Sequence, residues 1–314
     1  ARHRLNAGRL ELMTGIRERR FWPTGTPPSQ AAAEAGKALL ERSRIPAKDL
    51  DLLIFAGVCR DRLEPATASA VHARLGLPAS CGFLDVSNAC LGFCNALVLA
   101  GNLIEAGQLR HALVVSGENG RPLLDWTLAQ MKEPSQTRHT LKRYFANLTI
   151  GGGAVAALLT RASELPPATP HLKLRAAVTR ADTNTNELCQ GGTSSNGGLE
   201  MMTDSEALME AGIALAGQTW EAFLAETGWS AATPARVVCH QVGRQHQRAL
   251  LERLGVDPDK DFISFPTLGN VGSVSLPLTL AQAWESGAIR PGDAVAGCGI
   301  GSGLSCMMLG FEVA

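Results

Sequence analysis

Three residues of this chain could together carry out chemistry on a carbonyl group. Cys90 follows a short β-type run, Gly82 to Val86, and a turn of small residues, and it opens an apolar helix-like segment. A thiol in the first turn of a helix lies among unpaired N–H groups at the positive end of the dipole, which favours thiolate. His240 and Asn270 stand at comparable strand-to-helix corners. A nucleophilic thiolate needs a neighbour that handles protons, and a carbonyl under attack needs hydrogen-bond donors.

Each of these residues also has an ordinary structural interpretation. Cys90 could be a small core residue, His240 a satisfied structural histidine and Asn270 a turn residue. The order of elements favours the chemical interpretation, because the second half of the chain repeats the first. The strand before His240 mirrors the strand before Cys59, and the segment 262–269 with Asn270 mirrors the strand before Cys90. We therefore expect an α/β protein of two duplicated halves, with parallel-sheet layers and strand-end loops that meet at one pocket.

The elements that must position these residues follow from hydrophobic periodicity and turn signals. Residues 161–170 contain three prolines and are expected to link an N-terminal half, 1–165, to a C-terminal half, 166–314. An amphipathic segment is expected at 122–132 and a Gly/Ser/Asn-rich loop at 189–198. Helices are predicted over 30–43, 65–75, 91–104, 205–226 and 275–286, and after His240. Strands are predicted over 51–58, 82–86, 111–116, 154–160, 171–179, 262–269, 294–298 and 304–313.

Composition excludes several classes of function. The chain has 314 residues, 45% of them hydrophobic, and 29 basic against 29 acidic side chains, so we expect neither a nucleic-acid nor an anionic-membrane partner. Eight cysteines without a CxxC pair indicate reduced thiols and a cytoplasmic protein. The apolar run 91–104 is too short for a transmembrane segment, and no targeting signal is visible.

Two cofactor classes are not expected either. The glycines at 299, 301 and 303 lack dinucleotide-binding spacing and lead into a strand rather than a helix. Cys90 and Cys94 lie one turn apart but have no histidine or acidic ligand nearby, so no metal site is expected. We therefore predict that the protein works without a cofactor.

Several motifs, distributed over the whole chain, carry a resemblance to a known family. The chain is similar to the ketoacyl synthase III branch of the thiolase superfamily at Thr14–Arg20 (TGIRERR), Asn88–Phe93 (NACLGF), His240-Gln241, Gly269–Gly272 (GNVG) and Gly299–Leu304 (GIGSGL). The resemblance implies a thiolase fold, a layered α-β-α-β-α sandwich, and a homodimer. It implies acyl-CoA or acyl-carrier-protein thioesters as substrates.

The resemblance also assigns roles to residues. It implies that Cys90 is the acylated nucleophile and that His240 and Asn270 stabilise an enolate. The backbone N–H groups of Cys90 and Ser302 would form the oxyanion hole.

Glu64 decides which reaction the resemblance implies. It lies 26 residues before Cys90, in a pattern similar to the OleA group of head-to-head hydrocarbon synthesis, where a glutamate reaches into the partner subunit's active site. Malonyl substrates form a carbanion by losing carbon dioxide, whereas joining two plain fatty acyl-CoA thioesters requires a base for the α-proton. A carboxylate in an apolar channel, its pKa raised by desolvation, suits that task. The resemblance thus implies a non-decarboxylative Claisen condensation to a 2-alkyl-3-ketoacyl-CoA.

Alternatives to this reaction remain open at the level of sequence. Glu64 could be a surface acid at a helix start before Pro65. The protein would then be a decarboxylating 3-oxoacyl-[acyl-carrier-protein] synthase III that uses a malonyl thioester. A non-catalytic thiolase-fold partner protein is a third alternative, against which the intact Cys90, His240 and Asn270 argue.

The N-terminal region departs from the family pattern. The tryptophan and arginine by which many ketoacyl synthase III enzymes hold the adenine of coenzyme A correspond to Arg9 and Met13 here. Arg244 and Arg248, one turn apart on the helix after His240, are alternative candidates for binding substrate phosphates. The family's first strand is also not found before Ala1, so we expect native sequence to precede this residue.

Overall fold

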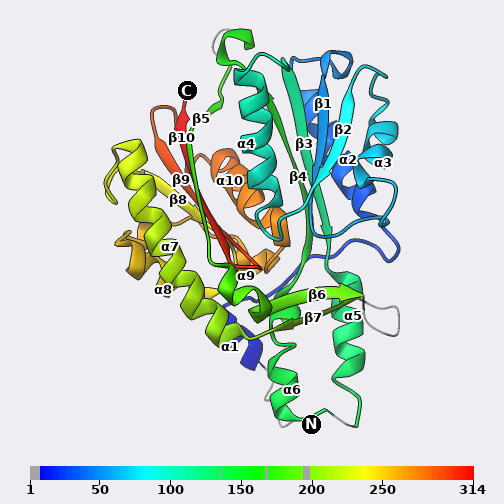
Figure 1. Cartoon of the computed structure of the whole chain (residues 1–314), viewed down its shortest axis with the longest axis vertical. Coiled ribbons are helices and arrows are strands. Elements are labelled where there is room, and N and C mark those ends of the chain that lie inside the picture. Colours follow the sequence, from blue (N-terminus) through cyan, green and yellow to red (C-terminus); the bar gives the residue numbers. More distant parts are fainter. Residues whose placement is uncertain (1–7, 135, 167–168, 194–198) are drawn as a thin grey trace.

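Two four-stranded sheets stand side by side in the molecule (Figure 1). The structure is a computed structural model and describes residues 8–134, 136–166, 169–193 and 199–314. The first sheet has the order β2-β1-β3-β4 and the second has the order β5-β10-β9-β8. The strands of the first are β1 (Leu52–Ala56), β2 (Gly82–Val86), β3 (His111–Asn119) and β4 (Gly152–Thr160). Those of the second are β5 (Leu172–Ala181), β8 (Arg236–Cys239), β9 (Ala294–Gly301) and β10 (Ser305–Val313).

Both sheets are mixed rather than parallel. β1 pairs in parallel with β2 and β3, and β8 pairs in parallel with β9, as expected. The prediction of purely parallel sheets is wrong for β4, β10 and β5, which are antiparallel to their neighbours. For β10 the reason is local, since only residues 302–304 separate it from β9, and so short a connection can join only antiparallel strands.

Helices cover both sheets and also fill the space between them (Figure 1). The helices α2 (Pro28–Arg42) and α3 (Thr67–Leu75) pack on the outer face of the first sheet. The helices α7 (Ser205–Thr227) and α8 (Arg244–Leu254) cover the outer face of the second. Between the sheets lie α4 (Gly92–Glu105) and α10 (Ser275–Glu285). The result is the five-layered α-β-α-β-α thiolase fold that the family resemblance implied.

The central helix α4 touches both sheets. Phe93, Ala96 and Ala100 belong to a buried cluster with β1 and β3, whereas Cys94 packs with side chains of the second sheet. Small residues on α4 let the two sheets approach it closely. Although the segment is apolar on every face, the helix is not wholly buried, because Leu99 is 39% exposed.

A smaller group of elements lies beyond one end of the sheets (Figure 1). This group comprises α1 (Arg9–Thr14), α5 (Arg121–Gln130), α6 (Arg138–Lys142), β6 (Cys189–Thr193) and β7 (Leu199–Thr203). The Gly/Ser/Asn-rich segment expected to be a loop begins instead with strand β6, which pairs with β7 in antiparallel fashion, while residues 194–198 lie outside the described residues. Short 3-10 turns occur at Ala47–Asp49, Ala146–Thr149, Ala162–Glu164, Thr183–Leu188, Pro258–Lys260 and Gly272–Val274.

The predicted strand over 262–269 is wrong. The segment contains a short helix, α9 (Phe265–Leu268), and an isolated bridge to Val237 of β8 is formed by Asp261, the residue just before the segment. Pro266 has no N–H for a strand ladder, and the N–H groups of Ser264 and Phe265 bind a side chain instead. The other predicted elements are confirmed with shifted ends, the largest extensions being those of β3, which continues to Asn119, and β9, which continues to Gly301.

The strands of the first sheet all lie within residues 52–160 and those of the second within residues 172–313. Among the described residues, no helix is both long and apolar enough to cross a bilayer.

Candidate active site

The loops that carry the candidate residues meet at the carboxyl ends of the parallel strands. Cys90 follows β2, and the turn at Ser302 follows β9 of the other sheet. A side chain at Gly301 would place its Cβ 3.5 Å from the backbone nitrogen of Cys90, so the two loops touch. Gly299, two residues earlier on β9, must also lack a side chain, because a Cβ there would lie 2.6 Å from the Leu91 side chain. These glycines therefore allow the Cys90 turn to pack on β9.

Cys90 lies in a tight turn before the helix rather than in its first turn. α4 begins at Gly92, with Leu91 at the N-cap, and Ala89 has the positive φ of 45°. Non-glycine residues rarely adopt such a conformation, and it is often associated with function. The prediction that Cys90 opens the helix is thus wrong by two residues, although the thiol still precedes the N-terminus of α4.

Cys90 was expected to be a thiolate, but its surroundings in the folded protein favour the neutral thiol. Burial is the largest cause that raises the pKa of the Cys90 thiol, followed by the charges of Glu118 and Cys189, and together they bring it to about 12. Desolvation penalises a charged sulfur more than the dipole of α4 stabilises it. At neutral pH the thiol form of Cys90 therefore predominates over the thiolate. Cys90 is therefore a neutral thiol until a substrate changes its surroundings.

His240 is buried directly after β8. Its backbone N–H donates a 2.8 Å hydrogen bond to the carbonyl of Cys298 on β9, which fixes the residue between two strands. Its Nδ1 has no hydrogen-bond partner among the described residues. Burial, and next the neighbouring His246, lower the pKa of His240 to about 3. The imidazole is therefore neutral at physiological pH, with one nitrogen able to donate a hydrogen bond.

Asn270 is held by its backbone between the two halves of the chain. Its N–H donates to the carbonyl of Thr149, and its own carbonyl accepts the N–H of Gly151 at 2.8 Å. The side-chain Oδ1 accepts hydrogen bonds from the Gly272 N–H at 3.0 Å and the Ser275 hydroxyl at 3.3 Å. With the oxygen engaged, the amide NH₂ is the part of the side chain left for a substrate.

One side chain connects the His240 loop to the Asn270 loop. Gln241 is buried, and its Oε1 accepts the N–H groups of Ser264 and Phe265 at 2.9 and 3.0 Å. Those residues start α9, which ends at Leu268, two residues before Asn270. The motif His240-Gln241 thereby supplies both a candidate catalytic side chain and the contact that positions another.

Ser302 lies in the turn between β9 and β10. Gly303 and Leu304 form this turn with φ values of 76° and 48°. The Ser302 hydroxyl donates to the sulfur of Cys189 at 3.2 Å, so its side chain is already engaged. The proposed donor at this position is the backbone N–H, and a Cβ at Gly301 would lie 3.5 Å from the Cys90 nitrogen, so the turn lies beside Cys90.

Glu118 is a site residue that the sequence reasoning did not identify. It is 4% exposed at the end of β3, and both of its carboxylate oxygens accept hydrogen bonds. The available signal was an acid at the end of a strongly apolar run, but the predicted strand stopped at Ser116. Glu118 is close enough to influence the Cys90 thiol electrostatically.

The remaining predicted site residues are not brought into this cluster within one chain. Glu64 is exposed, and among the described residues its side chain forms no hydrogen bond or ion pair. The apolar channel expected around it is therefore not supplied by its own chain. Arg244 and Arg248 are exposed on α8, where Arg244 packs near Gly15 of the N-terminal motif. Arg9 and Met13 are exposed on α1.

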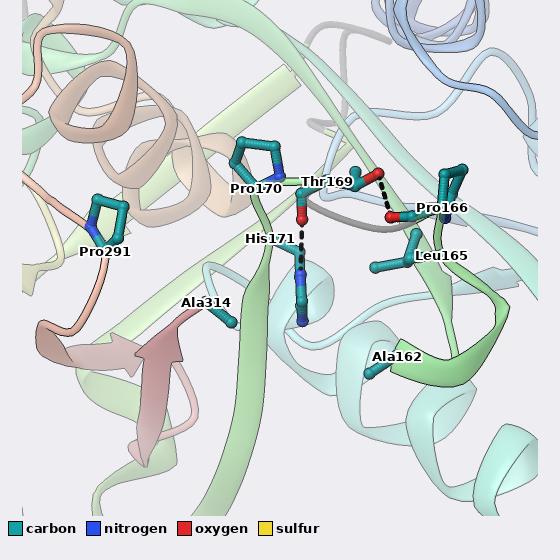
Figure 2. A pocket seen from close by; sticks show the side chains of 8 residues that line it. All are labelled: Ala162, Leu165, Pro166, Thr169, Pro170, His171, Pro291 and Ala314. Carbon is teal, nitrogen blue, oxygen red and sulfur yellow. Dashed lines mark hydrogen bonds between the residues drawn. The ribbon is translucent and has the colours of Figure 1, made fainter.

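A hollow of about 400 Å³ lies at the opposite end of β10 (Figure 2). It is open and largely apolar, and His171, its one titratable side chain, already binds the carbonyl of Thr169 through Nδ1 at 2.9 Å. Its lining residues are Ala162, Leu165, Pro166, Thr169, Pro170, His171, Pro291 and Ala314. None of the candidate residues contributes to it. The described residues also contain no group of three or more histidine, cysteine or acidic side chains that could hold a metal ion.

Two family models match this chain and show its class of protein. Residues 84–169 match the model of 3-oxoacyl-[acyl-carrier-protein] synthase III, and residues 224–312 match the model of its C-terminal region. The acyl-CoA:acyl-CoA alkyltransferase of Shewanella oneidensis is 40% identical over 98% of this chain and 89% of that protein. The β-ketoacyl-[acyl-carrier-protein] synthase III of Rhodospirillum centenum is 32% identical over 90% of this chain and 83% of that protein.

Solved structures agree with the sequence relatives. OleA of Xanthomonas campestris, in a cysteine-to-serine variant with bound lauric acid and lauroyl-CoA, has a TM-score of 0.93 at 37% identity, covering 99% of this chain and 90% of that one. The chain belongs to the 3-oxoacyl-[acyl-carrier-protein] synthase III family of thiolase-fold acyltransferases and, within it, to the OleA-type alkyltransferases.

Proposed function

We propose that this protein catalyses the non-decarboxylative Claisen condensation of two fatty acyl-CoA molecules to a 2-alkyl-3-ketoacyl-CoA and free coenzyme A. The relatives named acyl-CoA:acyl-CoA alkyltransferase support the choice of substrates. The observation that carries the proposal is the contact of the Cys90 turn with the β9 turn, on a scaffold whose loops also hold His240 and Asn270.

In the first step, the Cys90 sulfur attacks the thioester carbonyl of one acyl-CoA. A carbon–sulfur bond to Cys90 forms, the bond to coenzyme A breaks, and the thiol proton leaves with the coenzyme A sulfur. The oxyanion that develops would be stabilised by the backbone N–H groups of Cys90 and Ser302. Because the Cys90 pKa is about 12, this proton transfer is part of the reaction rather than a preceding equilibrium.

In the second step, a base removes an α-proton from another acyl-CoA, and the enolate carbon attacks the acyl group on Cys90. His240 and the Asn270 amide are placed to donate hydrogen bonds to the enolate oxygen. A pKa of about 3 suits His240 to this role, because a neutral imidazole donates a hydrogen bond without giving up its proton. The bond to Cys90 then breaks, and its sulfur recovers a proton.

We assign the base to Glu64 of the partner subunit. In the Xanthomonas campestris OleA variants, a glutamate and a cysteine were replaced that are 26 residues apart, the same separation as Glu64 and Cys90. Within its own chain, Glu64 is exposed, as a residue that acts across an interface would be. Burial by the partner would then supply the desolvation that a carboxylate base needs.

A homodimer that forms along the edge strand β2 would bury Glu64 against the partner subunit. β2 ends the first sheet and is partly exposed along its length, with Phe83 48% exposed. The loop after β1 adds Leu63, which is 92% exposed next to Glu64. An uncovered edge strand with exposed apolar side chains favours pairing with another chain, here a second copy. All eight cysteines are free, and we propose a reducing, cytoplasmic location.

The proposal is tested with lauroyl-CoA, alone and together with a malonyl thioester, by mass spectrometry of the products. We expect the condensed 2-alkyl-3-ketoacyl-CoA from lauroyl-CoA alone. Glu64→Gln should keep acyl transfer to Cys90 but lower this condensation by roughly 10²-fold or more. Glu105→Gln, an exposed glutamate at the far end of α4, serves as the matched control and should remain active.

Mixing inactive variants tests donation across the interface. Glu64→Gln and Cys90→Ala should each lack condensation, whereas some hybrid dimers contain one complete site and should recover it. A product formed only when a malonyl thioester is present would instead support the decarboxylating synthase, the activity named for the 32% identical Rhodospirillum centenum relative.

A further inference from the structure

A buried carboxylate joins two loops of the candidate site. Glu118 Oε1 accepts the Val58 N–H at 2.9 Å and the Ser273 hydroxyl at 2.7 Å, and Oε2 accepts the Cys59 N–H at 3.0 Å. Val58 and Cys59 begin the loop that carries Glu64. Ser273 follows Asn270 by three residues. One side chain therefore holds two loops whose neighbouring residues would act in the same step.

The surroundings of Glu118 are shaped to fit it. Gly272 has a φ of 55°, and a Cβ at this position would lie 3.1 Å from Glu118 Oε1. Because the Ser273 hydroxyl donates its one proton to Glu118, it can accept the proton of the Ser116 hydroxyl at 2.9 Å, and the Ala56 carbonyl lies 3.2 Å from its oxygen. Every polar contact of the carboxylate comes from a donor, which matches the acceptor-only ionised form. A buried charge with several donors holds its position closely, because breaking the set leaves it unsatisfied.

We propose that Glu118 is a positioning residue for condensation. It keeps the loop of Glu64 and the loop of Asn270 in a fixed position relative to each other beside Cys90. The inference rests on the proposed function, because it assigns both loops to the carbon–carbon bond-forming step. Glu118 would not exchange protons with the substrate. Its second effect is electrostatic. Gly57 lies between Glu118 and the start of α4, because a Cβ at Gly57 would lie 3.5 Å from Glu118 Oε1 and a Cβ at Gly92 would lie 3.6 Å from the Gly57 nitrogen. The negative charge of Glu118 therefore opposes a premature thiolate at Cys90 and keeps this thiol protonated until an acyl-CoA arrives.

The Glu118→Gln variant distinguishes loop positioning and the electrostatic effect on Cys90 from a general loss of structure. The amide cannot accept hydrogen bonds on both ends, so one loop should lose its anchor, and a misplacement on the order of 1 Å lowers turnover by about 10²-fold. We expect condensation of lauroyl-CoA to fall by about that factor. The titratable groups acting on Cys90 are Glu118, Cys189 and Cys94. Without the Glu118 charge, the pH profile of Cys90 alkylation by iodoacetamide should move to lower pH by about half a unit or more.

Ser273→Ala tests the anchor without changing the charge, and it also serves if Glu118→Gln fails to fold. It should lower condensation by about 10-fold and leave the alkylation profile where it is in the wild type. Ser29→Ala is the matched control: it removes a buried hydroxyl that has no hydrogen-bond partner among the described residues, and it should stay within about 2-fold of wild type.

The inference is overturned if folded Glu118→Gln condenses lauroyl-CoA like wild type, or if Ser273→Ala does so when the first variant is unfolded. A wild type that forms no product from lauroyl-CoA alone refutes the proposed function instead. In that case the alkylation profile still decides the electrostatic part: an unchanged profile in Glu118→Gln refutes it, and a shift to lower pH supports it.

Discussion

The buried histidine beside the site makes a quantitative prediction about pH and stability. His246 lies on α8 with its Nδ1 unpaired among the described residues, and burial lowers its pKa from an ordinary 6.5 to about 4. Above pH 6.5 the histidine is neutral in both the folded and the unfolded protein. Between pH 6.5 and pH 4 only the unfolded chain binds the proton, so the folded state loses stability as the pH falls through this window.

The size of the effect follows from the two pKa values. At pH 5 protonation of this histidine stabilises the unfolded chain by about 2 kcal/mol, whereas it stabilises the folded protein by almost nothing. His240 adds a similar loss, because its pKa is about 3. Asp261 acts in the opposite direction: burial raises its pKa to about 6, so the folded state gains stability as the pH falls through that value. The total pH dependence therefore mixes several groups, and a comparison between variants is needed.

His246→Gln isolates one contribution, because Gln has a similar size and does not titrate. We expect the free energy of unfolding of the wild type to fall between pH 7 and pH 5 by about 2 kcal/mol more than that of the variant. Urea denaturation at fixed protein concentration measures both, and a constant slope with urea shows that the same surface unfolds. At pH 8 the difference between the proteins reports packing alone. Parallel pH dependences in the two proteins would refute a buried neutral His246.

Three further predictions concern the site itself. Incubation with lauroyl-CoA should add one acyl mass to the peptide containing Cys90, and an acylated Cys90→Ala protein would reject this assignment. His240→Ala and Asn270→Ala should still be acylated but condense about 10²-fold more slowly, since each loses an enolate donor; normal condensation in both would contradict their role. Gly269→Ala should destabilise the protein by about 2 kcal/mol or more, because φ is 69° and the Cβ would collide with the Thr149 backbone carbonyl; an unchanged melting temperature would disprove that.

Local sequence signals determined much of the scaffold. Continuous apolar runs such as Leu52–Ala56 predict buried strands, and that strand is fully buried. The predicted strand 262–269 was wrong because its apolar residues surround Pro266 and depend on a distant partner, Gln241. Periodicity does not report such a long-range hydrogen bond. The same limitation explains why Glu118 was missed, since its role depends on donors 60 and 155 residues away in the chain.

The sequence by itself determined which residue types are available for chemistry, namely a thiol, an imidazole and an amide in segments that precede helices, and motifs that indicated the family. Only the tertiary structure decided their chemical states. Burial and a nearby carboxylate make Cys90 a neutral thiol, although its place before α4 predicted a thiolate. Burial likewise makes His240 a neutral hydrogen-bond donor. The physical reason is that desolvation depends on atoms brought from every part of the chain, whereas a helix start can be recognised from its own few residues.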